Sequence, residues 1–115
     1  MKLPLFFEDS KIPVILSKIG PIEIGAISLG IAVFSRGKMS DITRRHETIH
    51  YRQWLELGFI GFLILYPLLW LIDVASGMSG YDAYRLSPFE IEAYNNQDDV
   101  TYLEKRKLFA WIRNL

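Results

Sequence analysis

Both histidines of the 115-residue chain lie four positions apart in one short stretch, HETIH. In an α-helix, residues four apart project from the same face, so the imidazoles of His46 and His50 would stand one turn apart. Two imidazoles placed in this way can bind one tetrahedral zinc ion. Glu47 would lie beside that face, where a carboxylate can accept a proton from a water that zinc has made more acidic. The spacing therefore predicts a hydrolytic zinc site, and the alternative is a polar helix face without a metal.

A catalytic zinc site needs a third protein ligand and leaves its fourth position to water. The sequence has no third histidine and no cysteine, so a carboxylate is expected. A downstream helix is predicted to begin at Ser87-Pro88, with serine as the cap and proline at the first helical position. Its two glutamates, Glu90 and Glu92, are the candidates. The Glu90 carboxylate could instead turn back to the cap, which would leave Glu92 as the ligand with Asn96 as its neighbour.

The chain before HETIH is predicted to be strands and loops, over residues 1–37. A short strand is expected at residues 14–16. Over residues 27–34, large apolar residues alternate with serine, glycine and alanine. This period of two predicts an edge strand or a β-hairpin, whose edge could pair with an extended peptide.

Residues 40–76 are predicted to form the HETIH helix, capped by Ser40 or Asp41, running into a long apolar helix over residues 57–72. That stretch, LGFIGFLILYPLLWLI, carries no charge. Sixteen helical residues extend about 24 Å, which is short for a bilayer crossing, and Pro67 is expected to kink or break the helix.

Three arrangements of the apolar stretch are compatible with a zinc site. It could be a buried core helix, a hairpin that bends near Pro67 and dips into a membrane, or a helix in the membrane interface with its aromatic residues at the headgroup level, namely Trp54, Tyr66 and Trp70. A single crossing is excluded, because it would place His50 and Glu90 on opposite sides of the bilayer. The stretch favours contact with a membrane surface or helix-mediated self-association.

The end of the chain is predicted to hold two further helices. One covers residues 87–97 and carries the candidate glutamates. The other is an amphipathic helix over residues 98–115, with Leu103, Phe109 and Ile112 facing inward. The whole is expected to be one small, mostly helical α+β domain, because 115 residues suffice for a single core.

Composition limits the partners and the location. The formal net charge is zero, which argues against a nucleic-acid-binding surface. The N-terminus, MKLPLFFEDSK, has a short apolar run broken by Pro4 and is a poor signal peptide. A cytoplasmic or membrane-associated location is expected.

HETIH followed by a separate helix bearing EIEAY resembles the gluzincin branch of the zincin metallopeptidases, in which HExxH is joined by a glutamate on a later helix, often within ExEAD-like or ExxAD-like text. On that resemblance the first glutamate is the ligand, which matches Glu90, and Ala93 stands in the alanine place. The chain departs from the pattern at Tyr94, where an acid usually supports a ligating histidine. The resemblance implies a small zincin-like fold and a Zn²⁺-dependent peptidase that acts on peptide or protein substrates with Glu47 as general base.

The longer text RRHETIHYRQWLELGFIGF, YRLSPFEIEAYNNQ and YLEKRKLFAWI is also similar to a group of small uncharacterised bacterial and phage proteins that read roughly HEKIHxxQ and FEREAY. This likeness covers about residues 22–115. A peptidase also needs a donor for the transition-state oxyanion. The candidates in the sequence are Tyr81, Tyr84, Arg85 and Tyr94.

Overall fold

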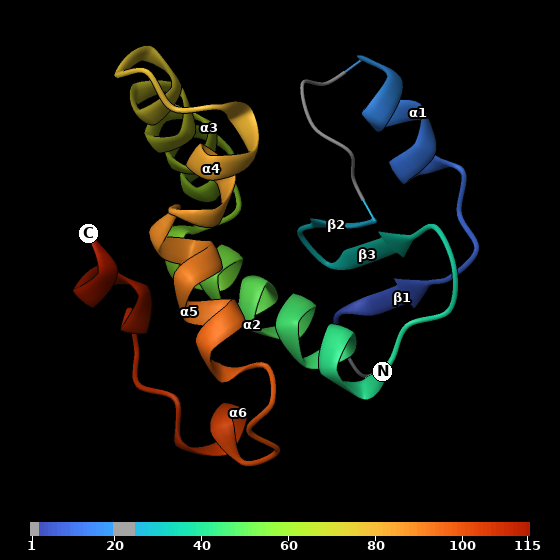
Figure 1. Ribbon diagram of the computed structural model, residues 1–115. Coiled ribbons are helices and arrows are strands. Elements are labelled where there is room, and N and C mark those ends of the chain that lie inside the picture. Colours follow the sequence, from blue (N-terminus) through green and yellow to red (C-terminus); the bar gives the residue numbers. More distant parts are fainter. Residues whose placement is uncertain (1–2, 20–24) are drawn as a thin grey trace.

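The chain folds into a small three-stranded sheet followed by a set of helices (Figure 1). This computed structural model describes residues 3–19 and 25–115. The predicted α+β class is confirmed. In chain order the elements are β1 (Leu5–Phe7), α1 (Ile12–Ile19), β2 (Ala26–Leu29), β3 (Ala32–Ser35), α2 (Asp41–Leu57), α3 (Ile60–Ala75), α4 (Gly80–Arg85), α5 (Pro88–Asn96), α6 (Tyr102–Lys105) and a final 3-10 helix, η1 (Ala110–Asn114).

The sheet has the order β1-β3-β2, so β3 is central and β2 forms an edge. β1 runs parallel to β3, and β2 runs antiparallel to it. The alternating segment at residues 27–34 is therefore a β-hairpin, one of its two predicted forms. It reverses at Gly30, whose φ of 72° lies in the left-handed region that glycine adopts without strain.

The prediction of a short strand at residues 14–16 is wrong, because this segment is part of helix α1. The Ser10 hydroxyl accepts a hydrogen bond from the backbone N–H of Ile12 at 3.1 Å, as a helix cap does. Pro13 then lies in the first turn, where its missing N–H removes no intrahelical bond. Ser10 and Pro13 are thus start signals of a helix.

The predicted continuous helix with a long apolar part over residues 57–72 is not found. α2 begins after Ser40, whose hydroxyl accepts from the N–H of Thr43 at 3.1 Å, and it ends at Gly58, whose φ is 57°. α3 is a separate helix of 16 residues, and the chain bends by 111° between the axes of α2 and α3. Pro67 lies inside α3 without ending it.

Within residues 3–19 and 25–115, no single helix combines the length and the apolar character that a bilayer crossing requires. α2 and α3 taken together meet that requirement by length and composition, but only across their sharp bend.

The core lies where α2, α3, α5 and η1 meet. It is built from four buried aromatic side chains, Trp54, Phe62, Phe89 and Trp111. Phe62 lies 4.6 Å from Trp54 and 4.9 Å from Phe89 between ring centroids. One side of α3 supplies Phe62 to this core, while much of the rest of the helix is exposed.

The prediction of one amphipathic helix over residues 98–115 is wrong, because this segment forms two short helices, α6 and η1. α6 stops at Arg106, whose backbone is extended and whose side chain is buried in ion pairs with Glu56 and Glu92. The extended backbone at Arg106 ends α6 at the position from which its side chain pairs with both carboxylates. Phe109 and Ile112, expected to face inward, are 41% and 48% exposed, and the buried side chains of η1 are Ala110 and Trp111.

Candidate metal centre

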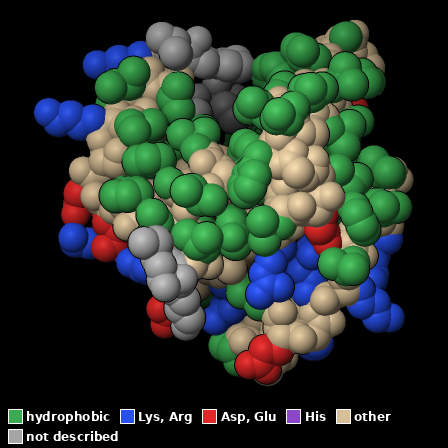
Figure 2. All heavy atoms as spheres, turned by 180° about the vertical axis from the view of Figure 1, so that it is seen from behind, with side chains coloured by type: hydrophobic (Ala, Val, Ile, Leu, Met, Phe, Trp, Pro, Cys, Tyr) green, Lys and Arg blue, Asp and Glu red, His purple; other side chains and the backbone are tan. Residues whose placement is uncertain are grey.

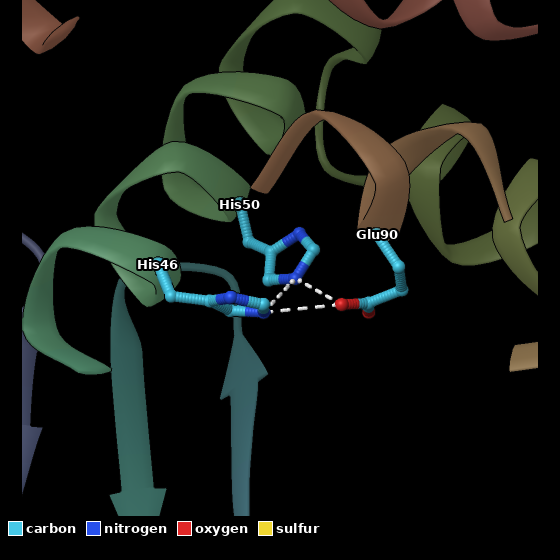
Figure 3. A group of neighbouring side chains, drawn as sticks. All are labelled: His46, His50 and Glu90. Atoms are coloured by element: carbon cyan, nitrogen blue, oxygen red, sulfur yellow. Dashed lines mark hydrogen bonds and ion pairs between the residues drawn. The ribbon is translucent and has the colours of Figure 1, made fainter. Parts of the chain in front are cut away.

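α2 and α5 lie side by side and bring His46, His50 and Glu90 together (Figure 3). The Nε2 atoms of the two histidines are 3.2 Å apart, and they lie 3.1 Å and 3.0 Å from Oε1 of Glu90. All three residues are buried, and they form a group that could hold a metal ion. Ligand atoms at about 2.0–2.1 Å from a tetrahedral ion are about 3.3 Å apart, so the observed triangle is close to the required size.

Each imidazole is oriented by a glutamine through its other nitrogen. Nδ1 of His46 is 2.8 Å from Oε1 of Gln97, and Nδ1 of His50 is 2.7 Å from Oε1 of Gln53. An amide oxygen only accepts, so each Nδ1 atom donates to its glutamine and Nε2 is the nitrogen left to face the centre of the group. Two Nε2 atoms and a carboxylate oxygen therefore point toward one place, which is the arrangement of a cation site.

Gln53 is itself held in place within the protein. Its side chain is completely buried, and its amide nitrogen donates to the carbonyl oxygen of Phe89 at 3.1 Å and to Glu92 at 2.9 Å. Because both of these partners are acceptors, the amide oxygen of Gln53 must face His50. Gln53 thus connects the HETIH helix to α5 at the level of the candidate ligands.

Glu92, the alternative third ligand, points away from the histidines. Its carboxylate accepts from Arg106 Nε at 2.5 Å and from the Tyr102 hydroxyl at 2.7 Å. Burial alone would raise the pKa of Glu92, but the hydrogen bonds from Arg106, Gln53 and Tyr102 outweigh it and lower the pKa. The structure thus places Glu90, and not Glu92, beside the two histidines. Asn96 donates to the backbone carbonyl of Glu92, not to its carboxylate.

The second oxygen of Glu90 accepts a hydrogen bond from the Tyr66 hydroxyl at 2.6 Å. With one oxygen facing the histidines and the other facing Tyr66, Glu90 does not form the capping interaction considered as a rival role. The Ser87 side chain makes no capping bond either, although α5 begins directly after it as the sequence predicts. One oxygen of the Glu90 carboxylate is therefore left facing the two histidines.

The electrostatics of the group favour positive charge at its centre. Burial alone would lower the pKa of His50, but the Glu90 carboxylate outweighs it and raises the pKa to about 9. Burial likewise opposes ionisation of Glu90, yet the neighbouring histidines hold its pKa well below the usual range. A proton or a metal ion can supply that positive charge.

Glu47 lies next to the candidate ligands in a cleft of about 750 Å³. Its side chain is buried, and desolvation raises the pKa of its carboxyl group. A raised pKa makes a carboxylate a better proton acceptor near neutral pH. His46, His50 and Glu90 line the same cleft, so the four predicted site residues share one space.

One wall of the cleft is the edge strand β2, and the opposite wall contains residues of α3 and α4. Three of the four candidate oxyanion donors, Tyr81, Tyr84 and Tyr94, line it. The hydroxyls of Tyr84 and Tyr94 are 2.7 Å apart, and the Tyr94 ring packs edge-on against His46 at 4.5 Å between centroids. Arg85 stacks over the outer face of the Tyr94 ring, 4.0 Å from its centroid, and does not line the cleft.

Sequence reasoning missed three residues that support the ligands: Gln53, Gln97 and Tyr66. Gln53 follows His50 by three positions on the same helical face, which is a signal that could have been used. The interfacial arrangement, one of three left open, places Tyr66 at the level of lipid headgroups, and Gln97 lies just beyond α5. Their contacts depend on how α2, α3 and α5 pack, which local spacing does not encode.

The combination of a small α+β fold and a buried His-His-Glu group in a cleft defines a candidate metalloprotein. Comparison of the chain with known protein families, with curated proteins and with solved structures finds no match.

Proposed function

We propose that this protein is a zinc-dependent metallopeptidase of the gluzincin type. The observation that carries the proposal is the convergence of His46, His50 and Glu90 on one point, with Glu47 beside them in the same cleft. Two imidazoles and one carboxylate form a ligand set that zinc enzymes use. Three protein ligands leave a position open for water, which distinguishes a catalytic site from a closed structural one.

When bound, zinc supplies Lewis acidity: it polarises a carbonyl oxygen and lowers the pKa of a coordinated water. The residues of the chain carry out the proton transfers. Glu47 accepts a proton from the attacking water and later donates it to the leaving amine. Burial raises the pKa of the Glu47 carboxyl group, which favours its accepting a proton. Gln53 and Gln97 keep the imidazoles in the tautomer that presents Nε2.

The cleft favours an extended peptide as the substrate. β2 is an edge strand along one wall, so its outer backbone groups can pair with a peptide by main-chain hydrogen bonds. Tyr84 and Tyr94 line the other side, and burial raises the pKa of each hydroxyl. Both therefore stay protonated at neutral pH, and either can donate to a developing oxyanion.

The experiment that tests the proposal compares wild type with Glu47→Gln. Zinc content is measured by elemental analysis, and cleavage is measured on a library of quenched fluorescent peptides. We expect about one zinc per chain in both proteins and a loss of roughly 10²–10⁴-fold in the cleavage rate of the variant. Glu104→Gln, an exposed site on α6, is the matched control and should cleave at the wild-type rate.

Two results would contradict the peptidase. If both proteins hold zinc and neither cleaves a peptide, the chain is a non-catalytic zinc-binding domain. If purified wild type holds less than about 0.2 zinc per chain without any chelator treatment, the metal site itself is rejected in favour of a metal-free interaction protein.

A further inference from the structure

An unusually apolar surface surrounds the α2–α3 bend. We call it the apolar face and define it by six exposed side chains: Leu29, Ile31, Phe59, Ile60, Leu63 and Ile64. Ile60 is 73% exposed, and Leu63 and Ile64 are 60% and 63% exposed. The face continues along α3, where Leu68, Leu71 and Ile72 are also about half exposed. Exposed apolar surface of this extent usually marks an interaction site.

The apolar face is continuous, although its residues come from two separate parts of the chain. The β2–β3 turn and the α2–α3 bend meet in one shallow hollow lined by Leu29, Ile31 and Phe59. Leu29 and Leu63 both line the candidate active-site cleft. The apolar face thus forms part of the rim of that cleft, and whatever covers the face lies beside its opening.

Two exposed cations lie close to the segments that lead to the bend. Arg52 lies on α2, and Lys107 follows Arg106, which pairs with Glu56 near the end of α2. Neither Arg52 nor Lys107 has a hydrogen-bond or ion-pair partner among the described residues. Lys11, just before α1, and Lys18 on α1 lie about one turn on either side of Ile15, which is 55% exposed. Figure 2 shows hydrophobic side chains spread over the upper part of this view, with Lys and Arg side chains at one flank and below them.

The buried glutamates leave the surface with an excess of positive charge. The whole chain has 13 basic and 13 acidic residues. Glu47, Glu56, Glu90 and Glu92 are withdrawn from solvent, whereas the cation buried with them is Arg106. A surface that is apolar at its centre and basic around it is complementary to an anionic lipid bilayer.

We propose that the apolar face docks on an anionic bilayer surface, so that the cleft opens beside the membrane. A second copy of the chain is a poorer occupant, because a two-fold interface through this face would bring the cations of both copies together. A lipid surface supplies the opposite charge and needs no matching hydrogen-bond groups. The proposal concerns binding alone and does not depend on peptidase activity.

Co-sedimentation with vesicles tests the proposal. Wild type should bind vesicles of phosphatidylcholine with phosphatidylglycerol more tightly than vesicles of phosphatidylcholine alone, and high salt should weaken the binding. The double variant Ile60→Ser/Ile64→Ser should bind at least tenfold less. Arg52→Gln should lose about fivefold, the contribution of one cation near an anionic surface. The matched control Val100→Ser/Leu115→Ser removes two side chains that are 76% and 74% exposed elsewhere and should bind like wild type.

Other outcomes would overturn the proposal. Wild type that binds neither kind of vesicle overturns it, as does a double variant that binds like wild type. If light scattering shows a dimer that the double variant dissociates and vesicles are not bound, the face belongs to a second copy. Circular dichroism of the double variant checks that it is folded, and none of these readings requires a substrate.

Discussion

The two carboxylate oxygens of Glu90 have different partners, and this division makes Glu90, rather than Glu92, the candidate third ligand. Oε1 faces both histidines, and Oε2 accepts from Tyr66 on α3. The hydrogen bond from the Tyr66 hydroxyl fixes Oε2 of Glu90, so Oε1 remains directed toward the two imidazoles. Support of this kind around a ligand sets its orientation and contributes to metal affinity.

The substitutions Glu90→Gln and Glu92→Gln separate the two roles, because each removes one charge with little change in shape. Glu90→Gln should weaken zinc binding by more than the roughly 10–100-fold that loss of an outer-shell partner costs. Glu92→Gln should keep the ligand set and affect stability more than affinity, because it weakens the pairing with Arg106. Competition against a chromophoric chelator measures both affinities. Equal zinc binding by Glu90→Gln and wild type would reject the assignment.

At this scale the sequence identifies the three residues that the structure brings together, but it does not identify the residues that orient them. His46, His50 and Glu90 follow from helical spacing, from the lack of other ligand types, and from resemblance to a known pattern. Gln53 and Tyr66 are polar residues whose roles appear only when other helices pack against them. A residue's type indicates what it can bind, but its partner depends on tertiary contacts.

At the scale of elements, the sheet has to be fixed relative to the HETIH helix for the cleft to exist. Glu8, just after β1, makes this connection: its carboxylate accepts from the backbone N–H of Met39 and lies 3.3 Å from Arg44. The Met39 hydrogen bond is the main cause that lowers the pKa of Glu8 below its usual value of 4.5. The ionised form is therefore the one that stabilises the fold.

This connection predicts a specific dependence of stability on pH. Because the pKa of Glu8 is lower in the folded state, its contribution is complete above pH 4.5 and is lost as the pH falls through the folded value. Urea unfolding of metal-free protein should show wild type more stable than Glu8→Gln at pH 7, with the difference shrinking toward pH 3. A difference that stays constant across this range would show that the Glu8 charge does not stabilise the fold.

The sequence predicts the type of an element correctly where local signals all indicate the same structure. It fails where a tertiary contact determines where an element ends. The hairpin, the cap at Ser40 and the start of α5 follow from period and capping residues. The bend after α2 occurs at Gly58, whose φ is positive. From the sequence alone, the helix could equally have continued through this glycine. The end of α6 depends on Arg106, whose partners lie 14 and 50 positions away.

At the scale of the whole molecule, Arg106 joins three segments that are distant in the sequence. It pairs with Glu56 at the end of α2 and with Glu92 on α5, and all three side chains are buried. Through Glu92 and Gln53 the connection continues to His50. The C-terminal segment is therefore part of the structure that holds the candidate metal centre.

Arg106→Met should destabilise the protein strongly, because it leaves two buried carboxylates without their counter-charge. Breaking a buried pair from one side costs about 3–5 kcal/mol. The matched control is Lys105→Met, which removes an exposed pair with Asp99 and should cost no more than about 1 kcal/mol. Urea unfolding of both variants measures the difference. A loss below about 1 kcal/mol for Arg106→Met would show that the network contributes little to stability.

The position of Arg106 in the chain also has a consequence for biosynthesis. His46, His50 and Glu90 all leave the ribosome before Arg106, which follows Glu90 by 16 positions. A nascent chain that already presents the three ligands still lacks the guanidinium that neutralises Glu56 and Glu92. The candidate cation-binding group is thus translated before the residue that fixes its scaffold, so the group can reach its final geometry only late in synthesis.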